Sequence, residues 1–214
     1  MVGGSKAPNS GMGCFSPLVV LIAFTITNII NYMDRGIIPG APEEVGEFAT
    51  HSTGSSKQDT LLGSLQSAFI GGYAVASLVF GHLVHVYPPF KLVGVGLAIW
   101  VIAIVASGAA PSYYFLLAAR VLSGVGEASF QCVVPTYIDD NAPPASRSLY
   151  LAIFYMAIPG GIALGYGWGA AIAGALSWRW AFFLEAPLMV PFVILCFFFP
   201  DPPKHQHPSF LDEE

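Results

Sequence analysis

The sequence has little charge. Of its 214 residues only 10% are Asp, Glu, Lys or Arg, against about 25% in a soluble domain of ordinary composition. Hydrophobic residues make up 55% of the chain and the mean hydropathy is +0.65. This shortage of charge argues against a soluble enzyme and for an integral membrane protein. The chain also lacks a basic block, so no nucleic-acid partner is expected.

Sequence motifs typical of enzymes are also scarce. Three cysteines, at positions 14, 132 and 196, are too few and too scattered for a disulfide framework, and they form no C-x-x-C pair. An intramembrane serine protease needs a Gly-x-Ser-x-Gly-like nucleophile and a partnering histidine within a span, but no such serine motif occurs and every histidine lies near a loop or in a tail. The spacing of His82 and His85, without neighbouring ligands, does not indicate a metal site. The sequence therefore predicts neither an enzyme nor a bound cofactor.

Long apolar stretches are abundant. Six of them reach the roughly 20 residues that a helix needs to cross a bilayer. They run over about Phe15–Ile38, Leu61–Tyr87, Phe90–Ala110, Tyr113–Ile138, Ser148–Leu176 and Trp180–Pro200. We therefore expect an all-α bundle of six transmembrane helices over residues 15–200, with a polar connection at Pro39–Thr60. Residues 1–14 are expected to form a cytoplasmic segment and residues 201–214 a cytoplasmic tail.

The basic residues predict the orientation of these spans. With the amino terminus in the cytoplasm, four of them lie in inner loops and two in outer loops, which agrees with the positive-inside rule. The inner residues are Lys6, Lys91, Arg147 and Lys204, and the outer residues are Lys57 and Arg179.

Four ionisable residues lie within the predicted spans: Asp34 and Arg35 in the first, Arg120 and Glu127 in the fourth. Each costs about 2.5–3.5 kcal/mol at the centre of a bilayer on insertion scales, so its presence needs a reason. Pairing Asp34 or Arg35 with Arg120 or Glu127 is the least costly way to bury them. Such pairs form either a static network that holds the bundle together or a proton- or substrate-linked site beside a water-filled cavity.

Polar and small residues extend these two spans. Thr27 and Asn31 precede Asp34 on one face of the first helix and are predicted to line a cavity. In the fifth span a four-residue spacing of small residues indicates a row along which another helix packs closely. This row consists of Gly161, Gly165, Gly169 and Ala173. Glu185, early in the sixth span, is expected at the outer interface beside Arg179.

Several motifs resemble those of a known family. The run RVLSGVGEAS, from Arg120 to Ser129, is similar to the fourth-helix motif of major facilitator transporters, and SWRWAFF, from Ser177, is similar to their entry to the sixth helix. NYMDR, GVGEAS and PTYIDD, which begin at Asn31, Gly124 and Pro135, together resemble the Spinster branch. The resemblance implies a transporter of sphingolipid or lysophospholipid.

The resemblance has two departures. The family's loop between helices two and three normally carries an aspartate after its glycine, but here Gly81 and Lys91 remain while His85 stands at the aspartate position. The family also has twelve spans in two six-helix halves, each half being two inverted three-helix repeats, and this sequence shows one half. We therefore expect a partner-dependent half that needs a second six-helix unit.

The resemblance also implies roles for individual residues. Asp34 and Glu127 would be protonation sites, and Arg35 and Arg120 their counter-charges or docking points for an anionic head group. Gly81, Gly124, Gly161 and Gly165 would serve gating or packing. The substrate would be a lipid or another amphiphilic small molecule, and the membrane that of the late endosome or lysosome, or the plasma membrane. The alternatives are a facilitator for another organic anion and a truncated product that does not transport.

Overall fold

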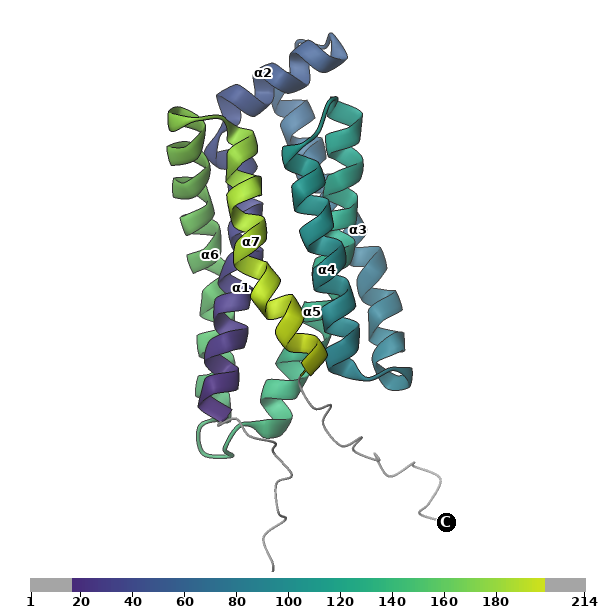
Figure 1. The fold of residues 1–214 in the computed structure, drawn as a ribbon, viewed down its shortest axis with the longest axis vertical. Helices are drawn as coiled ribbons and strands as arrows, with labels where there is room; N and C mark the ends of the chain where they lie inside the picture. Colours follow the sequence, from purple (N-terminus) through teal and green to yellow (C-terminus); the bar gives the residue numbers. More distant parts are fainter. Residues whose placement is uncertain (1–16, 199–214) are drawn as a thin grey trace, which may run out of the picture.

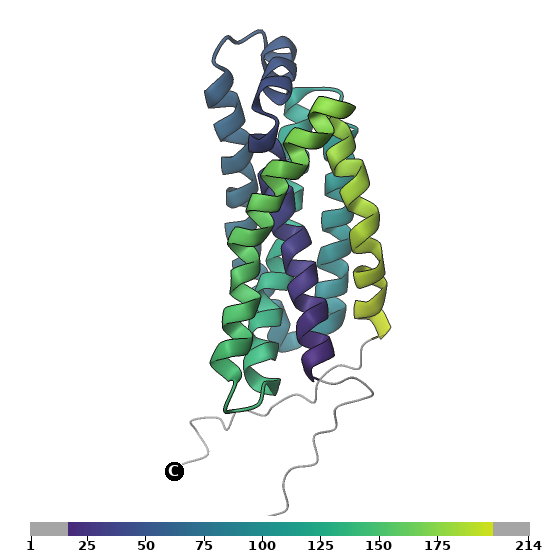
Figure 2. The ribbon, with the colours of Figure 1, turned by 90° about the vertical axis from the view of Figure 1, so that its left-hand side faces the viewer.

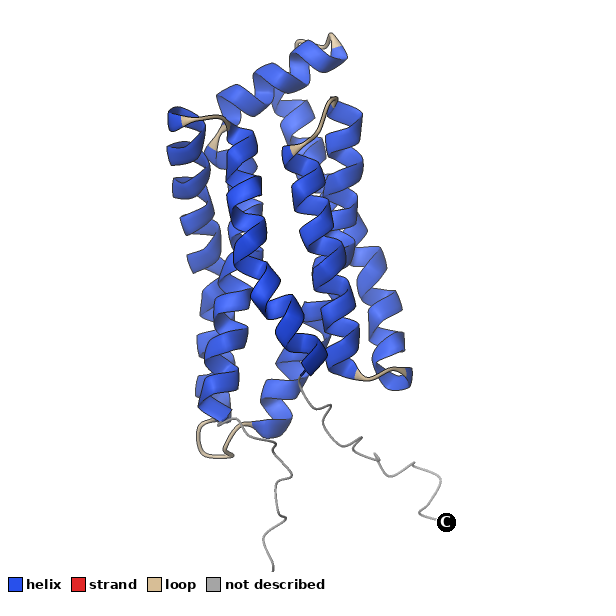
Figure 3. Cartoon of the chain, viewed as in Figure 1, coloured by secondary structure: helices blue, strands red, loops and turns tan. Residues whose placement is uncertain are grey.

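The computed structural model describes residues 17–198, and no strand occurs in that range (Figure 3). Six long helices run side by side along the long axis, and a short helix lies across one end (Figures 1 and 2). The helices are α1 (Pro17–Gly40), α2 (Pro42–Thr53), α3 (Gln58–Val86), α4 (Pro89–Gly108), α5 (Tyr113–Asn141), α6 (Arg147–Ala175) and α7 (Trp178–Phe198). The expected all-α bundle is thus confirmed.

The six predicted spans correspond to α1 and to α3 through α7, with ends that differ by a few residues. Helix α2 lies within the polar connection expected at Pro39–Thr60, where no helix was predicted. Its signals are local: Pro42 stands in the first turn, Glu43 and Glu44 favour the positive end of the helix dipole, and Gly54 ends the helix with a φ of 70°. The predicted segments 1–14 and 201–214, and residues 15–16 and 199–200 of the predicted spans, lie outside the described residues.

Five of the helices, α1, α3, α4, α6 and α7, are long and apolar enough to cross a membrane. Helix α5 has 29 residues but is less apolar, because it carries Arg120 and Glu127 in its middle and Asp139 and Asp140 near its end. It packs closely against both α3 and α4 within the bundle. Helix α1 begins and α7 ends at the end of the bundle opposite α2, as an even number of crossings requires (Figure 1).

Three glycines of the predicted row of small residues lie in the contact between α6 and α1. The contact between α6 and α1 is more extensive than the contact between any other two helices. A Cβ added to Gly161, Gly165 or Gly169 would lie 2.6, 2.1 or 2.5 Å from a backbone oxygen of α1. Only glycine permits this approach, so these residues fix α1, the helix that carries Asp34 and Arg35, against α6.

Two further glycines were predicted to serve gating or packing, and their surroundings in the structure differ. A Cβ on Gly124 would lie 2.2 Å from the carbonyl oxygen of Phe69, so Gly124 brings α5 close to α3. A Cβ on Gly81 would meet nothing within 4 Å among the described residues. Gly81 therefore makes no close helix contact there, and its role in a gate stays a prediction.

Candidate functional site

The first of two buried ion pairs joins α1 to α5. Nη1 of Arg120 donates hydrogen bonds to both carboxylate oxygens of Asp34, at 2.7 and 2.8 Å, and both side chains are completely buried. The hydroxyl of Ser123, one turn along α5, donates a third hydrogen bond to Asp34 at 3.3 Å. The structure thus brings together two of the four residues that were expected to pair.

The second pair lies beside the first. Nη2 of Arg35 donates to Oε1 of Glu127 at 2.6 Å, and Nε lies 3.4 Å from Oε2. The Glu127 side chain is completely buried, whereas that of Arg35 is 23% exposed. The predicted pairing is therefore confirmed for all four residues, and Arg35 is the member of the network that remains partly accessible.

Aromatic rings support the Arg35 guanidinium. Its central carbon lies 4.4 Å from the ring centre of Tyr32, 4.7 Å from that of Phe69 and 5.4 Å from that of Tyr73. Ring faces attract cations, most strongly where water is excluded. Phe69 also lies 4.9 Å from the guanidinium of Arg120, so one ring contacts both arginines. These aromatic neighbours come from α1 and α3 and were not predicted from the sequence.

Helix geometry explains why the four charges pair in this way. Adjacent residues on a helix point about 100° apart, so Asp34 and Arg35 can address two different partners. Arg120 and Glu127 are seven residues apart and therefore lie on one face, two turns from each other. One face of α5 thus presents a cation and an anion to the two neighbouring charges of α1.

The polar stripe on α1 differs in part from the expectation. Thr27 donates to the carbonyl of Ala23 in its own helix, and it borders a pocket of only about 10 Å³. Asn31 is completely buried, and neither of its amide atoms has a hydrogen-bond partner among the described residues. Asn28, which was not singled out, accepts from Gln131 of α5 at 2.7 Å and donates to the carbonyl of Phe154 in α6 at 2.9 Å. Asn28 thus links α1 to α5 and α6, and the cavity-lining role of Thr27 and Asn31 stays a prediction.

Glu185 does not lie at the outer interface beside Arg179, and that expectation was wrong. Its side chain is completely buried, and neither carboxylate oxygen has a hydrogen-bond partner among the described residues. Arg179 instead donates to the carbonyls of Gly108 and Ala110, which holds the start of α7 against the end of α4. The rule that singled out Asp34, an ionisable residue within an apolar span, applies equally to Glu185.

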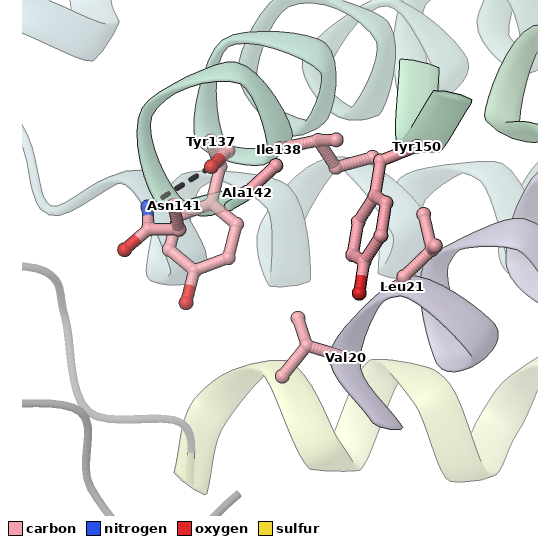
Figure 4. Close-up of a pocket in the computed structure, with 7 residues that line it drawn as sticks. All are labelled: Val20, Leu21, Tyr137, Ile138, Asn141, Ala142 and Tyr150. Carbon is pink, nitrogen blue, oxygen red and sulfur yellow. Dashed lines mark hydrogen bonds between the residues drawn. The ribbon is translucent and has the colours of Figure 1, made fainter. Parts of the chain in front are cut away.

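A pocket at the opposite end of the bundle from α2 lies between α1, α5 and α6 (Figure 4). Its volume is about 20 Å³, room for roughly one water molecule. It is lined by Val20, Leu21, Tyr137, Ile138, Asn141, Ala142 and Tyr150. The amide of Asn141 donates to the carbonyl of Tyr137 at its edge. A pocket of this size cannot enclose a lipid.

No group of three or more His, Cys, Asp or Glu residues in the described range is arranged to hold a metal ion. The ionisable side chains that pair at the centre of the bundle are carboxylates and guanidiniums.

Six long helices in one bundle, with buried charged side chains on the first, fourth and last of them, are consistent with one half of a major facilitator fold. The family profile of the Major Facilitator Superfamily matches residues 21–214. The chain belongs to this superfamily.

Its relatives place it near the Spinster branch. It is 41% identical over 203 residues to "Probable sphingolipid transporter spinster homolog 2" of Arabidopsis thaliana, covering 90% of this chain and 42% of the relative. It is 37% identical over 185 residues to "Protein spinster homolog 1" of Homo sapiens, covering 85% of this chain and 34% of the relative. The chain thus spans about two fifths or less of the length of these curated relatives.

Solved structures show the same fold. A bacterial homolog of the human lysosomal transporter Spinster, in an inward-facing and occupied conformation, matches with a TM-score of 0.77 at 23% identity, covering 89% of this chain and 46% of that chain. A proton:xylose symporter matches with a TM-score of 0.77 at 18% identity, covering 87% of this chain and 45% of that chain.

Proposed function

We propose that this chain forms one half of a Spinster-type secondary transporter that moves a sphingolipid or a lysophospholipid and is coupled to protons. The observation that carries the proposal is the pair of buried ion pairs between α1 and α5. Its substrate class rests on the likeness to curated sphingolipid transporters.

Arg35 is the residue best suited to bind the head group. It is the only partly exposed member of the two ion pairs, and three aromatic rings surround its guanidinium. Guanidinium binds phosphate in a bidentate manner, and the aromatic rings offer an apolar surface for the adjoining part of an amphiphile. An anionic head group would compete with Glu127 for the same donors.

This competition supplies a coupling between proton and substrate. When Glu127 is ionised it holds two donors of Arg35. When Glu127 takes up a proton its attraction for Arg35 falls, and the guanidinium becomes free for an anionic group. A network that served only to hold the bundle together would not need an accessible guanidinium. The partial exposure of Arg35 therefore favours a site for substrate or proton over a static network.

The proposed cycle requires a second six-helix unit. Transporters of this type alternate access by rocking one bundle against another around a site at their interface. A single bundle offers Arg35 no opposing wall, and a charge against lipid is costly. We therefore propose that the chain acts with a second half.

The test compares the chain alone with the chain in a complete transporter. We expect no saturable uptake of labelled sphingosine 1-phosphate or lysophospholipid by liposomes that contain the purified 214-residue chain. A chimera in which the chain replaces the matching segment of the Arabidopsis relative should take up one of these lipids. Arg35→Gln should abolish that uptake, and Lys57→Gln, at an exposed position, should leave it unchanged.

Three results would contradict the proposal. Uptake by the chain alone would show that no second half is needed and would point to a homodimer. Uptake of water-soluble organic anions but of neither lipid would favour the alternative facilitator. Uptake unaffected by Arg35→Gln would remove the proposed head-group site.

A further inference from the structure

The buried centre of the bundle holds more negative than positive groups. Three carboxyl groups are completely buried within the described residues: those of Asp34 on α1, Glu127 on α5 and Glu185 on α7. Only two guanidiniums, those of Arg35 and Arg120, balance them there, and each is already paired. A charge buried in a membrane without compensation is costly. One of the three carboxyl groups therefore needs a proton.

Glu185 is placed to share this centre. It lies two turns inside the start of α7, on the face of that helix that carries the buried Phe182, Ala186 and Met189. The charged groups that act on it are Asp34 from α1 and Arg120 and Glu127 from α5. Helices α4 and α6 also pack on α7. The one charged residue of α4 is Lys91 and that of α6 is Arg147, and both lie near the starts of their helices, at the opposite end of the bundle from Glu185.

Unused hydrogen-bonding groups on Arg120 and Glu185 are complementary. Arg120 uses Nη1 for both oxygens of Asp34, while its Nε and Nη2 are buried and have no partner among the described residues. Both carboxylate oxygens of Glu185 are buried and likewise unsatisfied. An unsatisfied buried group is expensive, and here the spare donors and the spare acceptors belong to groups that interact electrostatically.

We propose that Glu185 is a proton-binding site and the second partner of Arg120. In the arrangement seen here, Glu185 carries the proton as a neutral acid while Arg120 binds Asp34. In the alternative arrangement the O–H bond of Glu185 breaks and an O–H bond forms on Asp34. Arg120 then turns its free donors to the ionised Glu185. The total charge of the centre does not change, and the proton has passed from α7 to α1.

As a step in transport this exchange rests on the proposed function, but as a site of protonation it can be tested without transport. A neutral carboxylic acid has a carbonyl band in the infrared spectrum that a carboxylate lacks. We expect the purified full chain, at neutral pH in a detergent that carries no ester or carboxyl group, to show this band and Glu185→Gln to lose it. Glu44→Gln, which changes an exposed carboxylate on α2, should retain it.

The alternative pairing makes a second expectation. In Asp34→Asn the partner of Arg120 is neutral, so Glu185 should ionise to replace it and the band should disappear although Glu185 is present. A band that survives Glu185→Gln would place the proton on another carboxyl group and overturn the proposal. A band that survives Asp34→Asn would overturn the exchange of Arg120 between the two acids.

Stability provides an independent measurement. Because glutamine has the shape of a neutral glutamic acid, Glu185→Gln should unfold within a few degrees of the unchanged chain. The double variant Asp34→Asn with Glu185→Gln leaves Arg120 without a carboxylate and should lose most of its folded protein. If Glu185→Gln alone were as damaging as the double variant, Glu185 would be ionised and the proposal wrong. Failure of lipid uptake by the chimera, with the infrared results intact, would contradict the proposed function and leave this site standing.

Discussion

Gly165→Ala should destabilise the bundle although it adds a single methyl group to a helix. The Cβ of the alanine would lie 2.1 Å from the carbonyl oxygen of Met33 and 2.9 Å from the Cα of Gly36. Both are backbone atoms of α1, so no side-chain rotation can make room. Ordinary contact begins at 3.4 Å, so α1 and α6 must separate by roughly 1 Å.

The expected cost follows from two opposing effects. Alanine is favoured over glycine in a helix by about 1 kcal/mol, whereas overpacking a tight contact costs about 1–3 kcal/mol. At Gly165 both clashing atoms belong to the backbone, so the upper part of that range applies and destabilisation of about 1–2 kcal/mol remains. At Gly167, where a Cβ would meet nothing within 4 Å, only the gain remains. The two variants differ by one methyl group at positions two residues apart on the same helix.

Thermal unfolding of the purified chain in detergent measures the difference. For a chain of this size about 1 kcal/mol shifts the midpoint by roughly 2–4 °C, so Gly165→Ala should melt several degrees lower and Gly167→Ala should not. In the chimera, Gly165→Ala should also weaken uptake, because Met33 and Gly36 flank Asp34 and Arg35. Equal midpoints for the two variants would refute the claim that glycine is needed along this seam.

Three other expectations follow from the same contacts. Arg120→Met should cost about 3–5 kcal/mol of stability, because it leaves the buried Asp34 carboxylate without a partner. Adding Asp34→Asn should restore most of this loss in the same unfolding assay. A double variant no more stable than the single one would argue against the pair. Glu127→Gln in the chimera should leave the protein folded but remove the pH dependence of lipid uptake, and an unaltered dependence would exclude Glu127 from coupling. With the natural cysteines replaced, Ser56→Cys and Ala145→Cys, both at exposed positions, should react with an impermeant thiol reagent from opposite sides of the membrane, and labelling from one side would contradict the six-span order.

The fold was predictable because a bilayer imposes simple demands on a sequence. Each crossing needs about 20 apolar residues, and this requirement alone located all six long helices. Helix α2 escaped because it does not cross the bundle and its residues are polar. Its proline, its early acids and its closing glycine favour a short helix, and the polarity of the segment argues only against a membrane crossing.

The charged pairs were predictable in kind, and the details of the site were not. Four ionisable residues in two spans required mutual pairing, and helical spacing placed Arg120 and Glu127 on one face. Which acid would meet which arginine depends on the rotation of α1, which the sequence does not define. The aromatic surround of Arg35 depends on the packing of α3 beside α1 and α5. Glu185 was misplaced because its nearness to Arg179 in the chain suggested a local pair, whereas helical spacing puts the two on different faces of α7.

The two ion pairs differ in their exposure, and this difference gives them different roles in the proposed mechanism. Asp34 and Arg120 are both completely buried, so in the proposed mechanism a change in their pairing needs a proton from another buried group. Among the described residues, Glu185 is the further buried acid that interacts with both. Arg35 is partly open while its partner Glu127 is sealed, so a ligand can approach the cation without exposing the acid. A proton that moves between Glu185 and Asp34 would change the ion pair that joins α5 to α1. Arg35 is the residue of α1 that follows Asp34. In the proposed mechanism a change at the Asp34–Arg120 pair therefore reaches the Arg35–Glu127 pair through one peptide unit, and this short connection would couple the proton to the substrate.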